Sequence, residues 1–162
     1  MSQPGTAAPA TGAPARSLSE AAPAAGPLEL GIACFAVIHL ALALTMALAP
    51  HTFFKAIGPF GVYNAHYIRD TATFYAALGV GGVISLRRRS WRVPLLAVLL
   101  AQYALHSLNH LLDIDRAHPR WTGYFDFASL AAATLLLGWL LREALREQRA
   151  EGQLRPTPKK ET

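Results

Sequence analysis

Long apolar stretches separated by short polar segments dominate the pattern along the chain. Four stretches have the length of about 20 residues with which a helix crosses a hydrocarbon core about 30 Å thick. They run from about 28 to 49, 67 to 86, 93 to 112 and 124 to 141. Within them, 95–101 and 130–141 have no polar face of the kind that a helix in a soluble bundle presents to water. We therefore predict an all-α fold, a four-helix transmembrane bundle.

The two ends of the chain have a different composition. Residues 1–26 are mostly Ala, Pro, Gly, Ser and Thr, which predicts a disordered tail because so little apolar surface is available for burial. Residues 142–162 are rich in charge, and their first part predicts an amphipathic extension that lies over the membrane surface before a basic tail. The membrane domain is thus expected to span residues 27–141.

Composition and charge support a membrane protein. Apolar residues make up 52% of the chain and charged residues 15%, whereas soluble domains carry about 25% charge. The net charge of +5 comes from basic clusters that abut the apolar stretches, where anionic lipid is the nearest partner. No nucleic-acid motif accompanies them, so the lipid bilayer is the expected partner. Cys34, the single cysteine, is expected to be a small buried packing residue.

The placement of Lys and Arg predicts the orientation. Eleven of the fifteen lie in the N-terminal tail, in residues 87–92 or in the C-terminal tail. Because loops rich in Lys and Arg stay on the cytoplasmic side, both termini are expected to be cytoplasmic in a multi-pass protein of the plasma membrane. The segment 51–66 would then be an outer loop, and its phenylalanines indicate that it lies across the mouth of the bundle.

Polar side chains recur at helical spacing near the outer ends of the second and third predicted helices, and Asp126 on the fourth and His39 on the first add polar groups at a similar level. Because ionisable groups in a membrane span usually mark function and face other protein groups, we expect these stripes to converge on one pocket. We expect Arg69 and Asp70 to form an ion pair or to serve as partners between helices. Small residues continue the stripe of the second helix as Ala77 and Gly81, with Gly79 and Gly82 nearby, which predicts close approach of another helix there. The candidate ligand or polar-network residues are His66, Arg69, Asp70, Gln102, His106, Asn109, His110, Asp113 and Asp126.

His106 and His110 stand four residues apart and could ligate one transition metal ion, with His39, His66, Asp70 or Asp113 as a further ligand. Haem ligation by His39 and His106 is an alternative, although no attachment motif is present. The polar stripes could instead be a structural network without a site. No Ser-His-Asp spacing is evident, so we expect a binding component in preference to an enzyme.

Several motifs resemble those of DoxX-like small bacterial membrane proteins and related uncharacterised families. The similar segments are Pro50 with its Phe-containing loop, His66-Tyr-Ile-Arg69-Asp70, Phe74-Tyr-Ala-Ala-Leu-Gly79, Arg92-Val-Pro-Leu, and His106 with Asn109-His110. The resemblance spans residues 30–141 and implies a four-helix bundle in a bacterial plasma membrane. It also implies a membrane or redox protein partner, and a homo-oligomer is a further expectation.

The sequence therefore favours a binding or accessory membrane component with an outer-facing His/Arg/Asp pocket between its helices. A metal- or haem-dependent membrane oxidoreductase subunit that uses the histidines of the third helix is the alternative from another class. A purely structural polar network is the third interpretation.

Overall fold

The computed structural model describes residues 25–153 of the chain, and within them it is entirely helical. The elements are α1 (Pro27–Leu48), α2 (Pro50–Ala56), α3 (Ala65–Arg87), the short 3-10 helix η1 (Arg89–Trp91), α4 (Arg92–Leu112) and α5 (Arg120–Gln153). The all-α prediction is confirmed. Most of the predicted N-terminal tail, residues 1–24, and the last residues, 154–162, lie outside the described residues.

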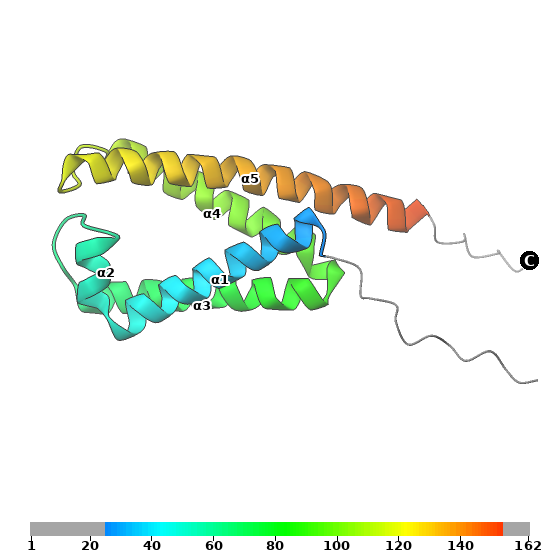
Figure 1. Ribbon diagram of the computed structural model, residues 1–162, viewed down its shortest axis with the longest axis horizontal. Coiled ribbons are helices and arrows are strands. Elements are labelled where there is room, and N and C mark those ends of the chain that lie inside the picture. The colour runs from blue at the N-terminus through cyan, green and yellow to red at the C-terminus, as the bar shows by residue number, and fades with distance from the viewer. Residues whose placement is uncertain (1–24, 154–162) are drawn as a thin grey trace, which may run out of the picture.

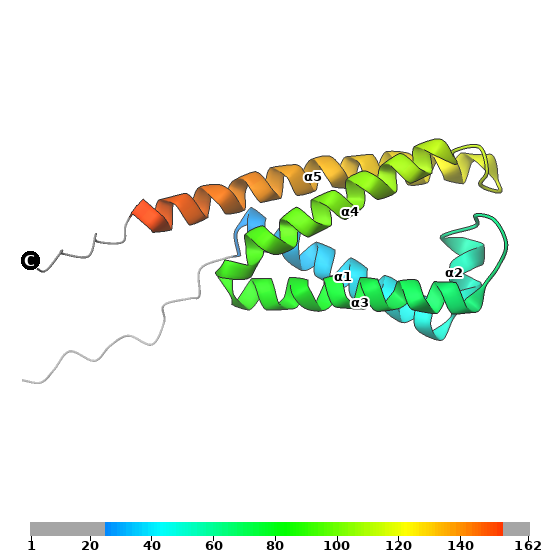
Figure 2. The ribbon, with the colours of Figure 1, turned by 180° about the vertical axis from the view of Figure 1, so that it is seen from behind.

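The long helices form two antiparallel pairs, α1 with α3 and α4 with α5 (Figure 1). Contacts between the two pairs are fewer. Both views show the pairs meeting near the start of α1 and separating toward α2 (Figures 1 and 2). We call the end of the bundle where α1 begins and α4 starts the tail end, and the opposite end the α2 end.

Three helices are long and apolar enough to cross a membrane: α1, the unit of η1 with α4, and α5. Their composition implies contact with a lipid bilayer. Helix α3 corresponds to the second predicted span but does not meet the same criterion. Arg69, Asp70 and three glycines within its 23 residues lower its hydropathy.

Helices α1 and α3 approach closely because α3 presents glycines to α1. A Cβ atom placed on Gly82 would lie 2.7 Å from the Cβ of Ala36, and one placed on Gly79 would lie 2.6 Å from the Leu40 side chain. The sequence predicted a close approach at the small residues of α3, and Gly79 and Gly82 make it, but the prediction put Ala77 and Gly81 at its centre. Gly81 faces Leu95 of α4 instead, and Ala77 is exposed.

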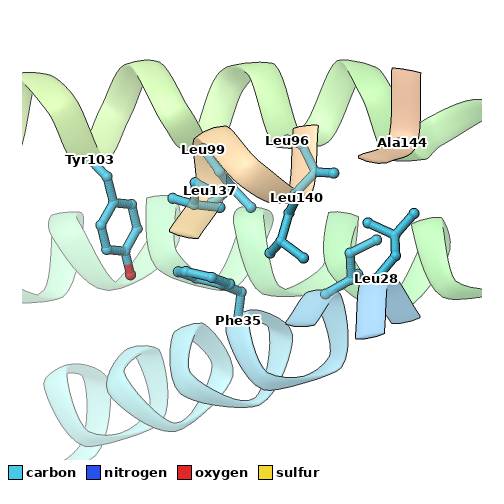
Figure 3. Packing of buried hydrophobic residues seen from close by; sticks show 9 residues of the cluster. Leu28, Phe35, Leu96, Leu99, Tyr103, Leu137, Leu140 and Ala144 are labelled. Atoms are coloured by element: carbon cyan, nitrogen blue, oxygen red, sulfur yellow. The ribbon is translucent and has the colours of Figure 1, made fainter. Parts of the chain in front are cut away.

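The apolar core lies in the half of the bundle nearer the tail end. Leu28 and Phe35 of α1, Leu96, Leu99 and Tyr103 of α4, and Leu137, Leu140 and Ala144 of α5 point toward one another (Figure 3). Leu96, Leu137 and Leu140 are completely buried. This layer joins α1 to the α4/α5 pair, so it holds the two pairs together.

Buried Arg92 joins three helices at the tail end, beside a cavity of about 480 Å³ between the start of α4 and α5. Its guanidinium lies 2.9 Å from a carboxylate oxygen of Glu29 at the start of α1 and 2.9 Å from one of Glu147 on α5. The Arg92 side chain is only 5% exposed. The sequence grouped Arg92 with the lipid-facing arginines, whereas it fixes three helix segments to one another. Its neighbour Arg89 pairs with Glu151 at 2.6 Å.

Helix α5 continues without a break through all 34 residues. At 1.5 Å per residue it is about 51 Å long, so it exceeds a hydrocarbon core of about 30 Å. The predicted extension beyond residue 141 is therefore helical, but it continues the axis of the last span, as Figure 1 shows, and does not turn aside. Glu147 and Glu151 hold it against α4. Cys34, expected to be buried, is exposed on α1.

Candidate functional site

A cavity of about 430 Å³ lies between the helix pairs at the α2 end. Both pairs contribute to it, together with α2 and the loop that follows. Most of the lining is apolar, with Leu42, Met46, Phe53, Ile57, Phe60 and Leu130. The polar lining comes from Thr71, Tyr75, Tyr103, His106, His110, Asp126 and Ser129. A mostly apolar cavity with a few converging polar groups is typical of small-molecule sites.

Helix α2 and the loop after it cover this cavity. Pro50 stands at the first turn of α2, where a missing N–H is tolerated, so the segment predicted as a plain loop begins as a helix. Phe53 and Ile57 line the cavity from this segment. The Phe60 ring meets the His110 ring edge to face, with centroids 4.8 Å apart. The expectation that residues 51–66 lie across the mouth of the bundle is thus confirmed for Phe53, Ile57 and Phe60.

A chain of polar contacts runs along α4 beside the cavity. The Nε2 atoms of His106 and His110 are 3.1 Å apart, as in a hydrogen bond in which one ring donates and the other accepts. One turn deeper, Gln102 Nε2 lies 3.5 Å from His106 Nδ1. These residues follow one another at i, i+4 and i+8, which places them on one helical face. The predicted grouping of Gln102, His106 and His110 is therefore present.

Two of the side chains that line the cavity have buried polar atoms without a partner, and Gln102 Oε1 and His39 Nε2 nearby are also unpartnered in the described part of the chain. Within residues 25–153, neither His110 Nδ1 nor Asp126 Oδ2 makes a hydrogen bond, and both residues line the cavity. Asp126 of α5 and His110 of α4 are near enough to interact electrostatically. A buried polar group left unpaired costs about 1–3 kcal/mol, so such groups call for a functional or structural explanation.

His39 belongs to a separate aromatic cluster. Its Nδ1 lies 2.7 Å from the Phe35 carbonyl oxygen, its ring stacks on Tyr75 at 5.2 Å, and Tyr103 lies beyond at 5.7 Å. Across the described part of the chain, no three or more His, Cys, Asp or Glu side chains are grouped so as to hold a metal ion. The predicted metal site with His106, His110 and His39 thus has two of its ligands in contact, and it stays a prediction.

The polar stripe of α3 faces away from this cavity. His66 and Asp70 form an exposed i, i+4 pair at 3.4 Å, and Arg69 donates to the Ala47 carbonyl oxygen at 3.5 Å. Arg69 and Asp70 do not pair with each other in the described residues, but Arg69 does have a partner on another helix, the Ala47 carbonyl oxygen of α1. Thr71 and Tyr75 are the α3 residues that line the cavity. The predicted His/Arg/Asp pocket therefore contains neither Arg69 nor Asp70.

Two further candidates lie outside the cavity, at the end of α4. Asn109 is exposed and does not line the cavity. Asp113 forms an ion pair with Arg116 at 3.2 Å in the turn that follows α4. Nearby, Asp115 lies 3.7 Å from Arg120 and accepts a hydrogen bond from the Tyr124 hydroxyl. These contacts stabilise the α4–α5 connection and do not reach the cavity.

Sequence reasoning missed the hydroxyl groups of the cavity. Tyr75 and Tyr103 interrupt apolar runs on α3 and α4, and Ser129 lies one turn after Asp126 on α5. A tyrosine inside an apolar run was the available signal, because a buried hydroxyl normally needs a polar partner. Spacing from His106 connects Tyr103 to the site, since residues three apart share a helical face.

No protein-family model matches this chain, and no curated protein or solved structure is significantly similar to it. The likeness to DoxX-like proteins therefore stays a prediction.

Proposed function

We propose that the chain is a four-span membrane protein that binds a small amphiphilic molecule in the cavity at the α2 end. The observation that carries this proposal is the pair of unpartnered buried atoms, His110 Nδ1 and Asp126 Oδ2, on residues that line a mostly apolar cavity. A bound molecule with one hydrogen-bonding head and an apolar body would satisfy these atoms and fill the space.

Chain connectivity supports a fourth crossing by α3. Arg92, at the start of α4, contacts Glu29 at the start of α1, so both helices begin on the same side of the membrane. Since α1 leaves that side, the chain has to return across the bilayer before α4 can begin. Helix α3 makes this return: its 23 residues measure about 35 Å, enough for one crossing.

The distribution of basic residues supports an orientation with the tail end in the cytoplasm. Arg87, Arg88, Arg89 and Arg92 lie there, and so does the charged end of α5. By the positive-inside rule, both termini are cytoplasmic and the cavity lies in the non-cytoplasmic half of the plasma membrane. A bacterial source and membership of the DoxX-like proteins are part of the same proposal, and they rest on the short motifs alone.

The lining favours an uncharged hydroxyl as the head group. An ionised Asp126 only accepts hydrogen bonds, whereas His110 donates or accepts depending on its tautomer. A hydroxyl can donate to the carboxylate and accept from the imidazole at the same time. An amphiphile with a carboxylate head would be repelled by Asp126. Leu42, Met46 and Ile57 provide the apolar surface for the body of the molecule.

Photolabelling in membranes tests this proposal. A diazirine analogue of 1-dodecanol is incubated with the protein in lipid nanodiscs and irradiated, and the labelled residues are mapped by mass spectrometry. We expect labelling near Phe60, His110 and Leu130 that excess 1-dodecanol reduces at least about tenfold, as for a specific site. Dodecanoate and dodecyltrimethylammonium should compete poorly. Labelling that follows lipid exposure alone, or that all three competitors reduce equally, would contradict the proposal.

Matched variants locate the head group. Asp126→Asn keeps the shape of the side chain but removes its charge, and His110→Phe removes both ring nitrogens. Both variants should lose competitor-sensitive labelling, whereas Leu135→Ala, at a side chain that is 78% exposed on α5, should not. Unchanged labelling in both cavity variants would show that these groups do not bind the head.

The contact between His106 and His110 favours a second candidate function, metal binding. Two imidazole nitrogens that bind one tetrahedral ion with bonds of about 2.0–2.1 Å lie roughly 3.4 Å apart. The observed Nε2–Nε2 separation of 3.1 Å is close to this value. In that case exogenous ligands or water would complete the coordination, and the protein would serve as a metal-dependent oxidoreductase subunit.

Elemental analysis and an absorption spectrum of the purified protein distinguish the two candidates. An equivalent of transition metal that His106→Ala removes, or a Soret band, would favour the oxidoreductase. We expect no equivalent of transition metal and no Soret band. We also expect competitor-sensitive photolabelling by the dodecanol analogue to persist when the protein is purified with a chelator.

A further inference from the structure

One face of α3 carries mostly charged and small side chains that are exposed, and at its edge Arg69 touches α1 through the Ala47 carbonyl oxygen. His66 and Asp70 are 79% and 57% exposed, and Arg69, Thr73 and Ala77 are exposed as well. Positions 66, 70, 73, 77 and 80 follow one another at intervals of four and three, as in the contact stripe of a coiled coil. We call these five positions together with Arg69 the α3 stripe.

The α3 stripe extends into the bilayer if α3 crosses it, and exposed charged side chains at that depth are unusual for a membrane helix. Measured from Ala65, Arg69 and Thr73 lie roughly 6 Å and 12 Å along α3, so part of the stripe reaches below the interface if the helix crosses the bilayer. Charged residues in a span normally face protein or water and pair with one another. Within residues 25–153, the one hydrogen bond from the Arg69 guanidinium is the long contact to Ala47.

The two charges lie on opposite flanks of the stripe. Successive residues of a helix differ by about 100°, so Arg69 lies about 40° to one side of Thr73 and Asp70 about 60° to the other. In a parallel pair of helices related by a two-fold axis, the first flank of one helix faces the second flank of its partner. Each Arg69 would then face the Asp70 of the other copy at the same depth.

We infer that the α3 stripe is the contact face of a parallel homodimer, which rests on the crossing of α3 in the proposed function. A two-fold interface uses the same patch on both subunits and must be self-complementary, and the stripe meets this requirement because it holds one cation and one anion. A partner with charge of a single sign would satisfy only one of them. Thr73 and Ala77, four residues apart, allow the close approach that helix dimers in membranes use.

The surface beside the stripe fits the same arrangement. A shallow groove of about 340 Å³ runs between α1 and α3 on the flank of Arg69, lined by small side chains such as Ala43, Ala47 and Ala76. Phe74 projects from the other flank of α3 and is 72% exposed. In the two-fold pair, the Phe74 ring of each copy lies against the groove of its partner. The charges thus set the register, and the aromatic ring adds apolar contact.

Cysteine cross-linking of the full chain in membranes tests the dimer. Cys34→Ser removes the only native thiol. In that background, Thr73→Cys and Ala77→Cys are oxidised with copper phenanthroline. We expect most of each protein to form a disulfide-linked dimer, whereas Leu135→Cys, an exposed position on α5, stays monomeric. Equal cross-linking at all three positions, or none at residues 73 and 77, would overturn the inference.

A charge exchange identifies the partner as a second copy. Arg69→Asp gives a chain with two acidic residues in the stripe, and Asp70→Arg gives a chain with two basic residues. Each variant alone should cross-link through Ala77→Cys at least about tenfold less, whereas co-expression of the two should restore cross-linking between them. Cross-linking that is unaffected in the single variants, or not restored in the mixture, would exclude this interface.

The same variants separate this inference from the proposed function. Arg69 and Asp70 do not line the cavity, so photolabelling by the dodecanol analogue should be unchanged in both of them. Loss of cross-linking with retained labelling supports a dimer distinct from the ligand site. If a membrane-impermeant maleimide applied from either side modifies Ala77→Cys rapidly, α3 does not cross the bilayer and the dimer is excluded with it.

Discussion

The tail end and the α2 end of the bundle each place ionisable side chains between the two helix pairs, but they use them differently. At the tail end, Arg92 has a carboxylate partner on α1 and another on α5, and an apolar core lies directly beside it. At the α2 end, His110 and Asp126 come from the two helices of one pair and keep unpartnered atoms beside a cavity. The ion pair of Arg92 with Glu29 thus joins the two helix pairs at the tail end, whereas the polar groups of His110 and Asp126 face a mostly apolar cavity at the α2 end.

If Arg92 joins the helix pairs at the tail end, its removal should have the largest effect on stability. Arg92→Ala leaves Glu29 and Glu147 without their partner, and breaking a buried ion pair costs about 3–5 kcal/mol. SDS unfolding followed by circular dichroism measures the change. The control is Arg146→Ala, which removes an exposed pair with Glu143 and should cost about 0–1 kcal/mol. Similar losses in both variants would contradict a special role for Arg92.

The next largest effect is expected when apolar side chains at the two ends are truncated, because those at the tail end should contribute more to stability. Leu140 is fully buried in the core at the tail end, so Leu140→Ala should destabilise the protein by about 2–5 kcal/mol. Ile57 is 44% exposed and borders the cavity, where surrounding atoms are fewer, and Ile57→Ala should cost less than about 1 kcal/mol. Thermal unfolding in one detergent ranks the two variants. A larger loss of stability in Ile57→Ala than in Leu140→Ala would contradict an apolar core at the tail end.

The unpartnered carboxylate allows a test in which stability and binding move in opposite directions. Asp126→Leu replaces a buried, unpartnered carboxylate with an apolar side chain of similar size. The free energy of unfolding should therefore stay the same or rise by about 1 kcal/mol. The substitution should also abolish competitor-sensitive photolabelling. Binding sites commonly combine lower stability with function in this way. A strong loss of stability would instead indicate that Asp126 belongs to a structural network, the third interpretation of the sequence.

The smallest effect is expected at the cover of the cavity. Phe60→Ala removes the edge-to-face contact with His110, which is worth about 0.5–1.5 kcal/mol, and opens the cavity on the side of α2. Stability should change little, while the bound dodecanol analogue should exchange faster, as measured by a delay between dilution and irradiation. Phe125→Ala, at an exposed ring on α5, is the control. Unchanged exchange would mean that this loop does not limit access.

The sequence predicted the fold class and most helix positions because long apolar runs leave few alternatives. It also predicted the grouping of Gln102, His106 and His110, since spacing on a single helix is enough to bring them together. It did not predict which face of α3 packs against the rest of the bundle. A polar stripe is expected to face the bundle, but Gly79 and Gly82 pack against α1 and turn Arg69 and Asp70 outward. Contacts between helices decide how α3 is rotated about its axis, and the polar stripe of one helix does not reveal those contacts.

Arg92 illustrates the same limit at the tail end. It is one of four arginines within six residues, and composition alone does not distinguish the one that becomes buried. The distinction comes from Glu29 and Glu147, which are far from Arg92 along the chain and approach it only after the helices have packed. Helix α2 was missed for a related reason, because its seven residues are too few to show a clear period.

The length of α5 has a mechanical consequence. One uninterrupted rod about 51 Å long, with Asp126 near one end and Glu147 near the other, magnifies small rotations. A tilt of about 10° around its cavity end displaces the far end by roughly 9 Å. Arg92 and Arg89 form ion pairs that hold α5 against the start of α4. A tilt of α5 would therefore have to break these two ion pairs or move η1 and the start of α4 with it.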